Sequence, residues 1–263
     1  GGGAAGDAPP ENPNRKKNDQ EASKRARGRW GKLRTALMAK SLFCAKVDAS
    51  ELYAEAKVGK RGPVATARDS PGMAKLEAIE KECAAKKTKW TDPDFPPNAV
   101  SLYRDPSRPT GGASITGWKR LGEMHPNPDL FQDGSEAGDV QQGQLGDCWF
   151  LGPLSVIADR EKLFYQLFLS STLSKWGVYG MRFWQNDKWV DVIVDDQVPV
   201  TYGDKLLNAH GPSNDEIWVP LIEKAYAKLH GCYEALIAGS EATAFLDLTG
   251  NPPTEARPDG LSG

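Results

Sequence analysis

One cysteine in this sequence stands where a cysteine could act as a nucleophile. The segment Gln142–Phe150 reads Gln-Gly-Gln-Leu-Gly-Asp-Cys-Trp-Phe, so Cys148 lies between a glycine-containing loop and a long apolar run. Gly143 and Gly146 indicate a turn in which positive φ costs little. The run from Trp149 predicts a buried helix. Cys148 would begin that helix, where unpaired N–H groups and the helix dipole favour an anion, here the thiolate that attacks carbonyl groups.

A second group of this loop could take part in the same chemistry. Gln142 lies six residues before Cys148. Its amide N–H could stabilise the negative oxygen that forms when a thiolate attacks a carbonyl. The alternative is a structural cysteine buried at the start of a helix, and local physics alone weighs the two interpretations about equally.

Further motifs follow one another in order along the chain. They are Thr91–Pro97 with Ser101–Tyr103, Trp118–Arg120, Pro126–Pro128 with Phe131, Phe183–Gln185 with Trp189–Asp196, and Trp218 with a long helix over Leu221–Leu236. Together with the Cys148 segment, these motifs resemble the calpain family of cysteine proteases. The resemblance extends roughly from Trp90 to Gly250.

The resemblance implies an α+β fold, the first subdomain of a papain-like, calpain-type protease core. This subdomain, assigned to residues 90–250, has a nucleophile helix, a long helix and short antiparallel strands. Residues 1–20 are rich in Gly, Pro, Asn and charge, which predicts a disordered arm. Residues 21–89 are expected to be a helical extension, and residues 251–263 a tail that does not match the family.

Local patterns predict two of these elements. In the extension, Ser70-Pro71 resembles a helix start, because proline is favoured at the first helical position. In the subdomain, Asn186-Asp187 is a turn signal between two paired strands. Along the second strand, alternation places Val190, Val192 and Val194 on one face and Trp189, Asp191 and Ile193 on the other.

Asp195-Asp196 could be a pair of metal-binding carboxylates at the end of that strand. The favoured interpretation is structural: the two carboxylates accept hydrogen bonds from backbone N–H groups.

A papain-type site also needs a histidine that takes the thiol proton and a third group that orients it. His210 lies in a polar loop and His230 near the end of the long helix, and neither matches the family's catalytic histidine. The resemblance places the histidine and its asparagine in a second subdomain beyond Gly263. The chain is therefore expected to hold half of an active site, and to be a fragment at both ends.

The resemblance also implies a calcium site and a substrate contact. It puts Gln132 and Gly134 on positions whose carbonyls bind Ca²⁺, and Asp139 and Glu216 on the two acidic positions. Hard oxygen ligands from flexible loops suit calcium, and no EF-hand loop is present. The alternative is ordinary solvated acids in polar loops. Gly239 matches a position whose backbone binds extended substrate, and without a side chain it would leave room for one.

Composition agrees with an intracellular, cytoplasmic protein. The net charge of −2 gives no general attraction to nucleic acid or membrane. The four cysteines contain no Cys-x-x-Cys pair, which argues against a zinc site or disulfide framework and suits a reducing compartment. No apolar run of about 18 residues exists, so no transmembrane span is expected. The basic stretch Arg15–Arg34 could bind acidic partners, but a solvated arm is favoured because no aromatic residues are interleaved with the charges.

These observations predict the nucleophile-bearing half of a calcium-dependent cysteine endopeptidase that cuts protein substrates by limited proteolysis. Cys148 would attack, with the oxyanion held by Gln142 and the Cys148 backbone N–H. The alternative is a non-catalytic calpain-like module that binds calcium or a protein partner. A weaker third possibility is a binding protein that acts through its basic arm.

Overall fold

The computed structural model describes residues 67, 69–109, 115–124, 127–131, 135–212 and 215–252. All of these lie within one compact unit, residues 48–255. The arm predicted for residues 1–20, most of the helical extension and nearly all of the tail lie outside the described residues. None of the helices in the described part of the chain is long and apolar enough to cross a membrane.

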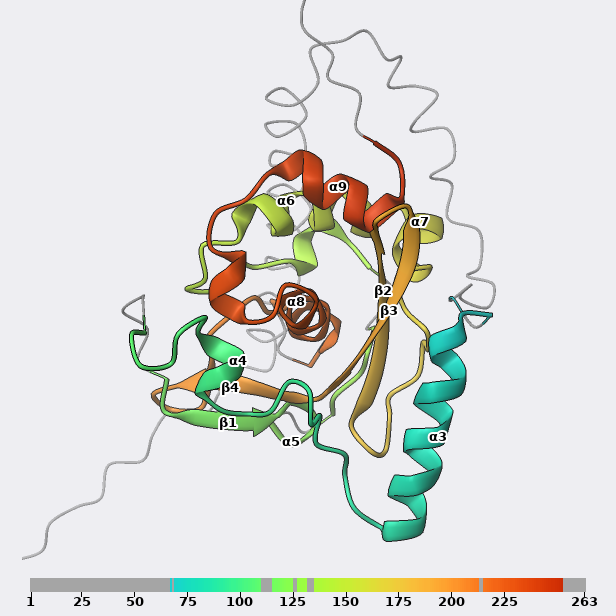
Figure 1. Ribbon diagram of the computed structural model, residues 1–263, viewed down its shortest axis with the longest axis vertical. Coiled ribbons are helices and arrows are strands. Elements are labelled where there is room, and N and C mark those ends of the chain that lie inside the picture. The colour runs from blue at the N-terminus through green and yellow to red at the C-terminus, as the bar shows by residue number, and fades with distance from the viewer. Residues whose placement is uncertain are drawn as a thin grey trace, which may run out of the picture. The chain divides into compact units, whose positions relative to one another are not determined.

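Groups of helices and short antiparallel strands follow one another along the chain, which confirms the α+β fold (Figure 1). The helices are α3 (Pro71–Lys86), α4 (Ala99–Leu102), α5 (Leu121–Met124), α6 (Cys148–Ala158), α7 (Glu161–Tyr165), α8 (Trp218–Leu229) and α9 (Glu241–Thr249), with 3₁₀ turns η1 (Ala137–Asp139) and η2 (Tyr233–Leu236). The strands are β1 (Gly117–Arg120), β2 (Val178–Gln185), β3 (Lys188–Asp195), β4 (Gln197–Thr201) and β5 (Lys205–Leu206). They form two antiparallel sheets, β1-β4-β5 and β2-β3.

The predicted pair of strands is the hairpin β2–β3, with Trp184 opposite Trp189. Asn186 and Asp187 make its turn with φ values of 50° and 59°. Positive φ at both central residues is what a two-residue hairpin turn requires, and Asn and Asp tolerate it better than most residues. The turn prediction is therefore confirmed.

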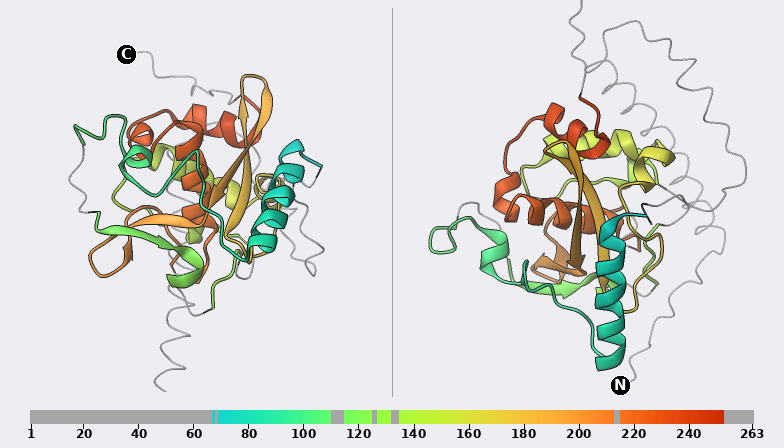
Figure 2. Two further views of the ribbon diagram at one scale, coloured as in Figure 1. Left: turned by 60° about the horizontal axis from the view of Figure 1, so that its bottom comes forward. Right: turned by 45° about the vertical axis from the view of Figure 1, so that its right-hand side comes forward.

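The two faces of this hairpin pack against different parts of the protein. Val192 and Val194 face the main core, whereas Ile193 belongs to a smaller apolar cluster with Leu76 of α3. Figures 1 and 2 show α3 lying along the hairpin, opposite the side that faces α8. Val192 and Val194 therefore lie on the face opposite Ile193, as the alternation predicted, and both faces of the hairpin are covered.

The start of α3 agrees with the predicted Ser-Pro signal in position but not in its hydrogen bonding. Pro71 occupies the beginning of the helix, yet the Ser70 side chain does not cap it. Instead, the Ser70 hydroxyl donates to the carboxylate of Asp191 on β3, which also accepts from the Gly72 N–H at 2.7 Å. This residue therefore ties the helix to the hairpin.

The long helix predicted over Leu221–Leu236 is shorter than expected. α8 ends at Leu229, and η2 follows as a separate 3₁₀ turn. Gly231 lies between them with φ of 100°, a left-handed conformation that ends the α-helix. Sequence periodicity continued past this glycine because both segments bury apolar side chains against the same core.

The centre of α8 is buried on all sides, and it contacts both the nucleophile helix and the hairpin. Its Tyr226 ring stacks on Phe150 of α6 with ring centroids 4.0 Å apart, and it lies 5.2 Å from Phe183 of β2. The Tyr226 hydroxyl donates to Asp247 of α9 at 2.7 Å. One aromatic side chain of α8 thus contacts three other elements of the core.

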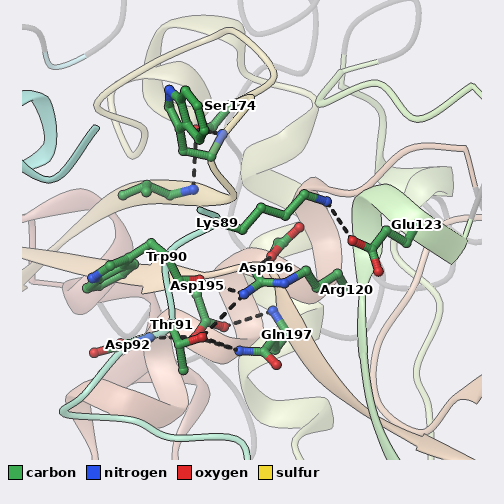
Figure 3. A network of polar contacts seen from close by, with 12 residues as sticks. Lys89, Trp90, Thr91, Asp92, Arg120, Glu123, Ser174, Asp195, Asp196 and Gln197 are labelled. Atoms are coloured by element: carbon green, nitrogen blue, oxygen red, sulfur yellow. Dashed lines mark hydrogen bonds and ion pairs between the residues drawn. The ribbon is translucent and has the colours of Figure 1, made fainter. Parts of the chain in front are cut away.

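A buried ion pair fastens α8 to the end of β3. Lys224 Nζ lies 2.5 Å from Asp195 Oδ1, and neither side chain is exposed. Asp195 also accepts from the backbone N–H groups of Asp92 at 2.7 Å and Gln197 at 2.8 Å. Beside it, Arg120 pairs with Asp196 (Figure 3). Backbone N–H groups bind Asp195 as predicted, whereas Asp196 is bound by the Arg120 side chain, so the predicted backbone bonds are confirmed for Asp195 only.

We expect Lys224→Met to destabilise the fold by about 3–5 kcal/mol, because it leaves the buried Asp195 carboxylate without its cation. The matched control is Lys119→Met, which breaks an exposed pair with Asp204 and should cost about 0–1 kcal/mol. Urea unfolding of the two variants measures the difference. Equal losses of stability in both would show that the buried pair has no special role.

Candidate functional site

Cys148 is the first residue of α6, as the sequence predicted, and its side chain is exposed. The residues that follow it are buried: Trp149 and Phe150 anchor the helix in the core. The indole N–H of Trp149 donates to the Leu236 carbonyl at 2.7 Å, and Phe150 stacks on Tyr226. An exposed thiol thus lies at the N-terminus of a helix whose first turn is anchored in the core.

The loop before Cys148 is held by backbone contacts to a second loop. The backbones of Gln141 and His210 bond to each other at 3.0 and 3.1 Å, and Gln144 N–H donates to the Leu207 carbonyl at 2.9 Å. A Cβ added to Gly143 would collide with the backbone of Asn208. The loop therefore needs a residue without a side chain at this contact.

This close approach corrects the reason given above for the two glycines. Neither Gly143 nor Gly146 is among the residues with positive φ. Gly143 is required by steric contact, and Gly146 accepts a hydrogen bond from the Ala238 N–H at 3.1 Å. The prediction of positive φ at these two glycines is wrong, and Gly143 is needed because two chain segments approach closely there.

Gln142 projects from this loop and is exposed. Its amide nitrogen donates to the Leu145 carbonyl at 2.9 Å, a bond within the loop itself. An amide nitrogen carries two hydrogens, so one N–H orients the group while the other can point toward solvent. The structure places Gln142 and Cys148 at the two ends of one short, fixed loop.

Gly239 lies next to the nucleophile helix rather than at a distance from it. A Cβ on Gly239 would collide with the indole ring of Trp149. The missing side chain therefore makes room for this tryptophan, while the residue itself is exposed to solvent. Its predicted contact with substrate stays a prediction.

The two histidines after Cys148 make local contacts. His210 Nδ1 lies 3.0 Å from the Asn208 carbonyl, a bond within its own loop. His230 follows α8 directly and packs its ring on Tyr226 at 4.5 Å. Burial lowers the pKa of His230, which favours the neutral ring. Their geometry gives both histidines local structural contacts.

Two of the four predicted calcium-binding positions are described, and two are not. Gln132 and Gly134 lie outside the described residues. Asp139 ends the 3₁₀ turn η1, nine residues before Cys148, and Glu216 precedes α8. A Cβ placed on Gly211 would lie 3.8 Å from both the Asp139 carbonyl oxygen and the Glu216 Cβ. The two acidic segments, far apart in sequence, therefore meet at Gly211.

The character of these acids fits a hard cation. The Asp139 carboxylate accepts a hydrogen bond from the Glu136 N–H at 2.7 Å, and burial raises the pKa of this carboxyl to about 6. Glu216 is only 4% exposed, and its backbone forms a bridge with Asp129, three residues before Gln132. The described residues contain no group of three or more His, Cys, Asp or Glu that could hold a metal. The resemblance assigns the two further ligands, the carbonyls of Gln132 and Gly134, to residues outside the described part of the chain.

One feature of the site was missed by the sequence reasoning. Asp147, directly before Cys148, and Glu223 of α8 are both fully buried and face each other. The available signal was the pair Glu223-Lys224 in the middle of an otherwise apolar helix segment. Charged residues are almost never fully buried unless they are paired.

Comparison with known proteins gives one consistent result. A family model described as calpain family cysteine protease matches residues 90–258, slightly beyond the Gly250 limit of the sequence resemblance. The chain is 44% identical to Calpain clp-4 of Caenorhabditis elegans over 179 residues, which are 66% of this chain and 24% of that protein. It is 40% identical to Calpain-5 of Mus musculus over 182 residues, 66% of this chain and 28% of that protein.

A third relative, Calpain-A of Drosophila melanogaster, is 39% identical over 199 residues, 74% of this chain and 22% of that protein. The chain thus spans about a quarter of the length of the curated relatives it matches. The match covers the nucleophile loop, the hairpin and the buried helix α8 described above. The chain therefore belongs to the calpain family of cysteine proteases.

Proposed function

We propose that this chain is the nucleophile-bearing half of a calcium-dependent cysteine endopeptidase. Cys148, as thiolate, attacks the scissile carbonyl of a protein substrate. The Gln142 amide and the Cys148 backbone N–H stabilise the resulting oxyanion. A second subdomain, outside this sequence, supplies the histidine that takes the thiol proton and the asparagine that orients it.

The observation that carries this proposal is the placement of Cys148. It is exposed at the first residue of a buried helix, whereas Cys83 and Cys232 are buried. A structural cysteine would be expected inside, since free cysteine is among the most buried residue types. Exposure at a helix start, beside a fixed loop that carries an amide donor, is the arrangement that acyl transfer by a thiolate needs.

Calcium and location complete the proposal. Asp139 and Glu216, with the carbonyls of Gln132 and Gly134, would hold Ca²⁺. The bound ion would supply positive charge between η1 and the segment before α8, and would offset the cost of burying the two carboxylates. Gly239 would bind extended substrate through its backbone. The three described cysteines, Cys83, Cys148 and Cys232, are free, which suits an intracellular, cytoplasmic protease that performs limited proteolysis.

This chain alone should not turn over peptide substrates, because the pairing of thiolate with imidazolium that gives papain-like cysteines a pKa of about 3–4 is missing. The measurement is steady-state hydrolysis of fluorogenic peptides, with Cys148→Ala as the matched control. Turnover that disappears in the Cys148→Ala variant would contradict the prediction. It would place a base among the residues of this chain.

Cys148 should be alkylated fastest of the four cysteines. It is exposed at a helix start, whereas Cys83 and Cys232 are buried. Burial also raises the pKa of Cys83, which lowers its thiolate fraction. Limited labelling with iodoacetamide, followed by peptide mapping, measures the order. The remaining cysteine, Cys44, lies outside the described residues and serves as an internal comparison. Preferential labelling of Cys44 or Cys83 would argue against Cys148 as the nucleophile.

Calcium should raise the melting temperature of this chain, because a ligand that binds only the folded state stabilises it. With two carboxylates, we expect a Kd on the order of 10⁻⁵ M or weaker. At a hundredfold excess over Kd, the gain is about 2.7 kcal/mol. Magnesium should do much less, since it requires a tighter octahedral shell and gives up water reluctantly. Thermal melts with calcium, magnesium or chelator measure the shift.

The variants for this measurement are Asp139→Ala and Glu216→Ala, which should lose the calcium shift. The matched control is Asp105→Ala, which removes an exposed carboxylate bound to Ser107 and should keep the shift. An equal calcium shift in all variants would place the ion elsewhere. No shift in the unaltered chain would remove calcium from this subdomain.

A further inference from the structure

Two carboxyl groups face each other beneath the nucleophile loop. Asp147 is the residue directly before α6, and Glu223 lies in the middle of α8; both side chains have 0% exposure. An aspartate before a helix ordinarily caps it by accepting from backbone N–H groups. Asp147 makes no such side-chain bond. Its carboxyl instead lies within hydrogen-bonding reach of the carboxyl of Glu223.

The donors around this pair do not satisfy two carboxylates. In the described part of the chain, no N–H or O–H group donates to either oxygen of Asp147 or to Glu223 Oε2. Glu223 Oε1 accepts one bond, from the Ala209 N–H at 3.1 Å. Two buried anions in contact, with one donor between them, would be very costly. One proton held between the two carboxyl groups converts the contact into a hydrogen bond.

The electrostatic surroundings agree with a single shared proton. Burial raises the pKa of Asp147 to about 6 and raises the pKa of Glu223 further, because the Asp147 charge also opposes its ionisation. Tyr233 of η2 and Asn208 face the same place. Asp195 at the end of β3 is neutralised by Lys224. No described cation pairs with the two carboxyls. At neutral pH, Glu223 therefore stays protonated, and its O–H donates a hydrogen bond to the Asp147 carboxylate.

Glu223 also connects the two ends of the nucleophile loop. At one end, it contacts Asp147, whose neighbour is Cys148. At the other, it binds the Ala209 N–H, in the loop whose backbone bonds to Gln141 and Gln144. The Glu223 side chain of α8 thus contacts Asp147 at one end of the segment that carries Gln142 and Cys148. At the other end, it contacts the loop to which that segment is bonded.

We propose that Asp147 and Glu223 share one proton and are positioning residues, which together hold Gln142 and the Cys148 backbone N–H at a fixed separation. This inference rests on the proposed function in one respect: the separation matters because both groups are taken to bind the oxyanion. The shared proton itself does not depend on that function. The shared proton and the positioning role are therefore tested separately.

The shared proton makes the folded state lose stability as pH rises. Both carboxyls have a folded-state pKa above the ordinary value, so between these values the folded state keeps protons that the unfolded state has released. Stability falls wherever the folded state binds more protons than the unfolded state. The contribution is complete below about pH 4 and is lost as pH rises through about 6 for Asp147, and higher for Glu223.

Glu223→Gln tests the proton. The amide N–H of glutamine donates to Asp147 without needing a proton from solvent, so the variant should gain melting temperature relative to the unaltered chain between pH 5 and pH 8, by about 3 °C or more. The matched control is Glu123→Gln, an exposed carboxyl paired with Lys89, for which the difference should be flat over this range. A flat difference for Glu223→Gln as well would overturn the shared proton.

Cys148 acylation tests the positioning. A thiolate that attacks p-nitrophenyl acetate forms a carbon–sulfur bond through a tetrahedral oxyanion and expels p-nitrophenolate, whereas exchange with methyl methanethiosulfonate expels methanesulfinate and forms no oxyanion. For Glu223→Leu, the rate ratio of acylation to disulfide formation at Cys148 should fall about fivefold or more. Glu223→Gln should keep the ratio, and so should Asp247→Asn, a buried carboxyl bound by Tyr226.

The outcomes separate this inference from the proposed function. If the unaltered chain is not acylated at Cys148 faster than a short cysteine peptide, the proposed function fails, and the melting comparison still decides the shared proton. If the unaltered chain is acylated and Glu223→Leu keeps the same ratio of rates, the positioning role is overturned. A lower ratio in Glu223→Leu, restored in Glu223→Gln, supports it.

Discussion

The buried contact between Lys224 and Asp195 is the constraint on which much of the described structure depends. Taking both charges out of water is costly, and the cost is met only because each group is bound on several sides. Asp195 accepts two backbone N–H bonds, and Lys224 donates also to the Gln197 carbonyl. These bonds join the segment before α4, the end of β3, the start of β4 and the centre of α8. Removing the Asp195 carboxylate would leave the other three segments without their common point of attachment.

The same helix carries two buried charged residues, Glu223 and Lys224, in neighbouring positions, and each contacts a different part of the protein. Lys224 points to the strands, and Glu223 points to the nucleophile loop. Since successive residues of a helix lie about 100° apart, two neighbours can reach opposite sides of the core. α8 therefore connects the loop before Cys148 with the strands of the sheets. A shift of α8 would therefore change the contacts both at the loop before Cys148 and at the strands.

Sequence reasoning was accurate where local chemistry decides structure. The hairpin follows from strict alternation and from Asn186-Asp187, and the start of α6 follows from the contrast between loop and apolar run. It was wrong, or missed a contact, where a segment far away in the sequence determines which residue is needed. The need for glycine at Gly143 comes from the Asn208 backbone, and the pairing of Asp147 with Glu223 joins residues 76 positions apart. Periodicity likewise ran past Gly231, because burial continues where the helix does not.

The position of α3 has a consequence for how much of the chain forms a soluble unit. The family match begins at residue 90, after α3 has ended. Yet Leu76 of α3 covers Ile193, Val178 and Leu169, and Gly180 allows its close approach. A piece trimmed to the family limits would keep every motif residue and expose an apolar sheet face. Such faces adhere to other chains, so trimmed material is expected to aggregate even though its active-site loop is intact.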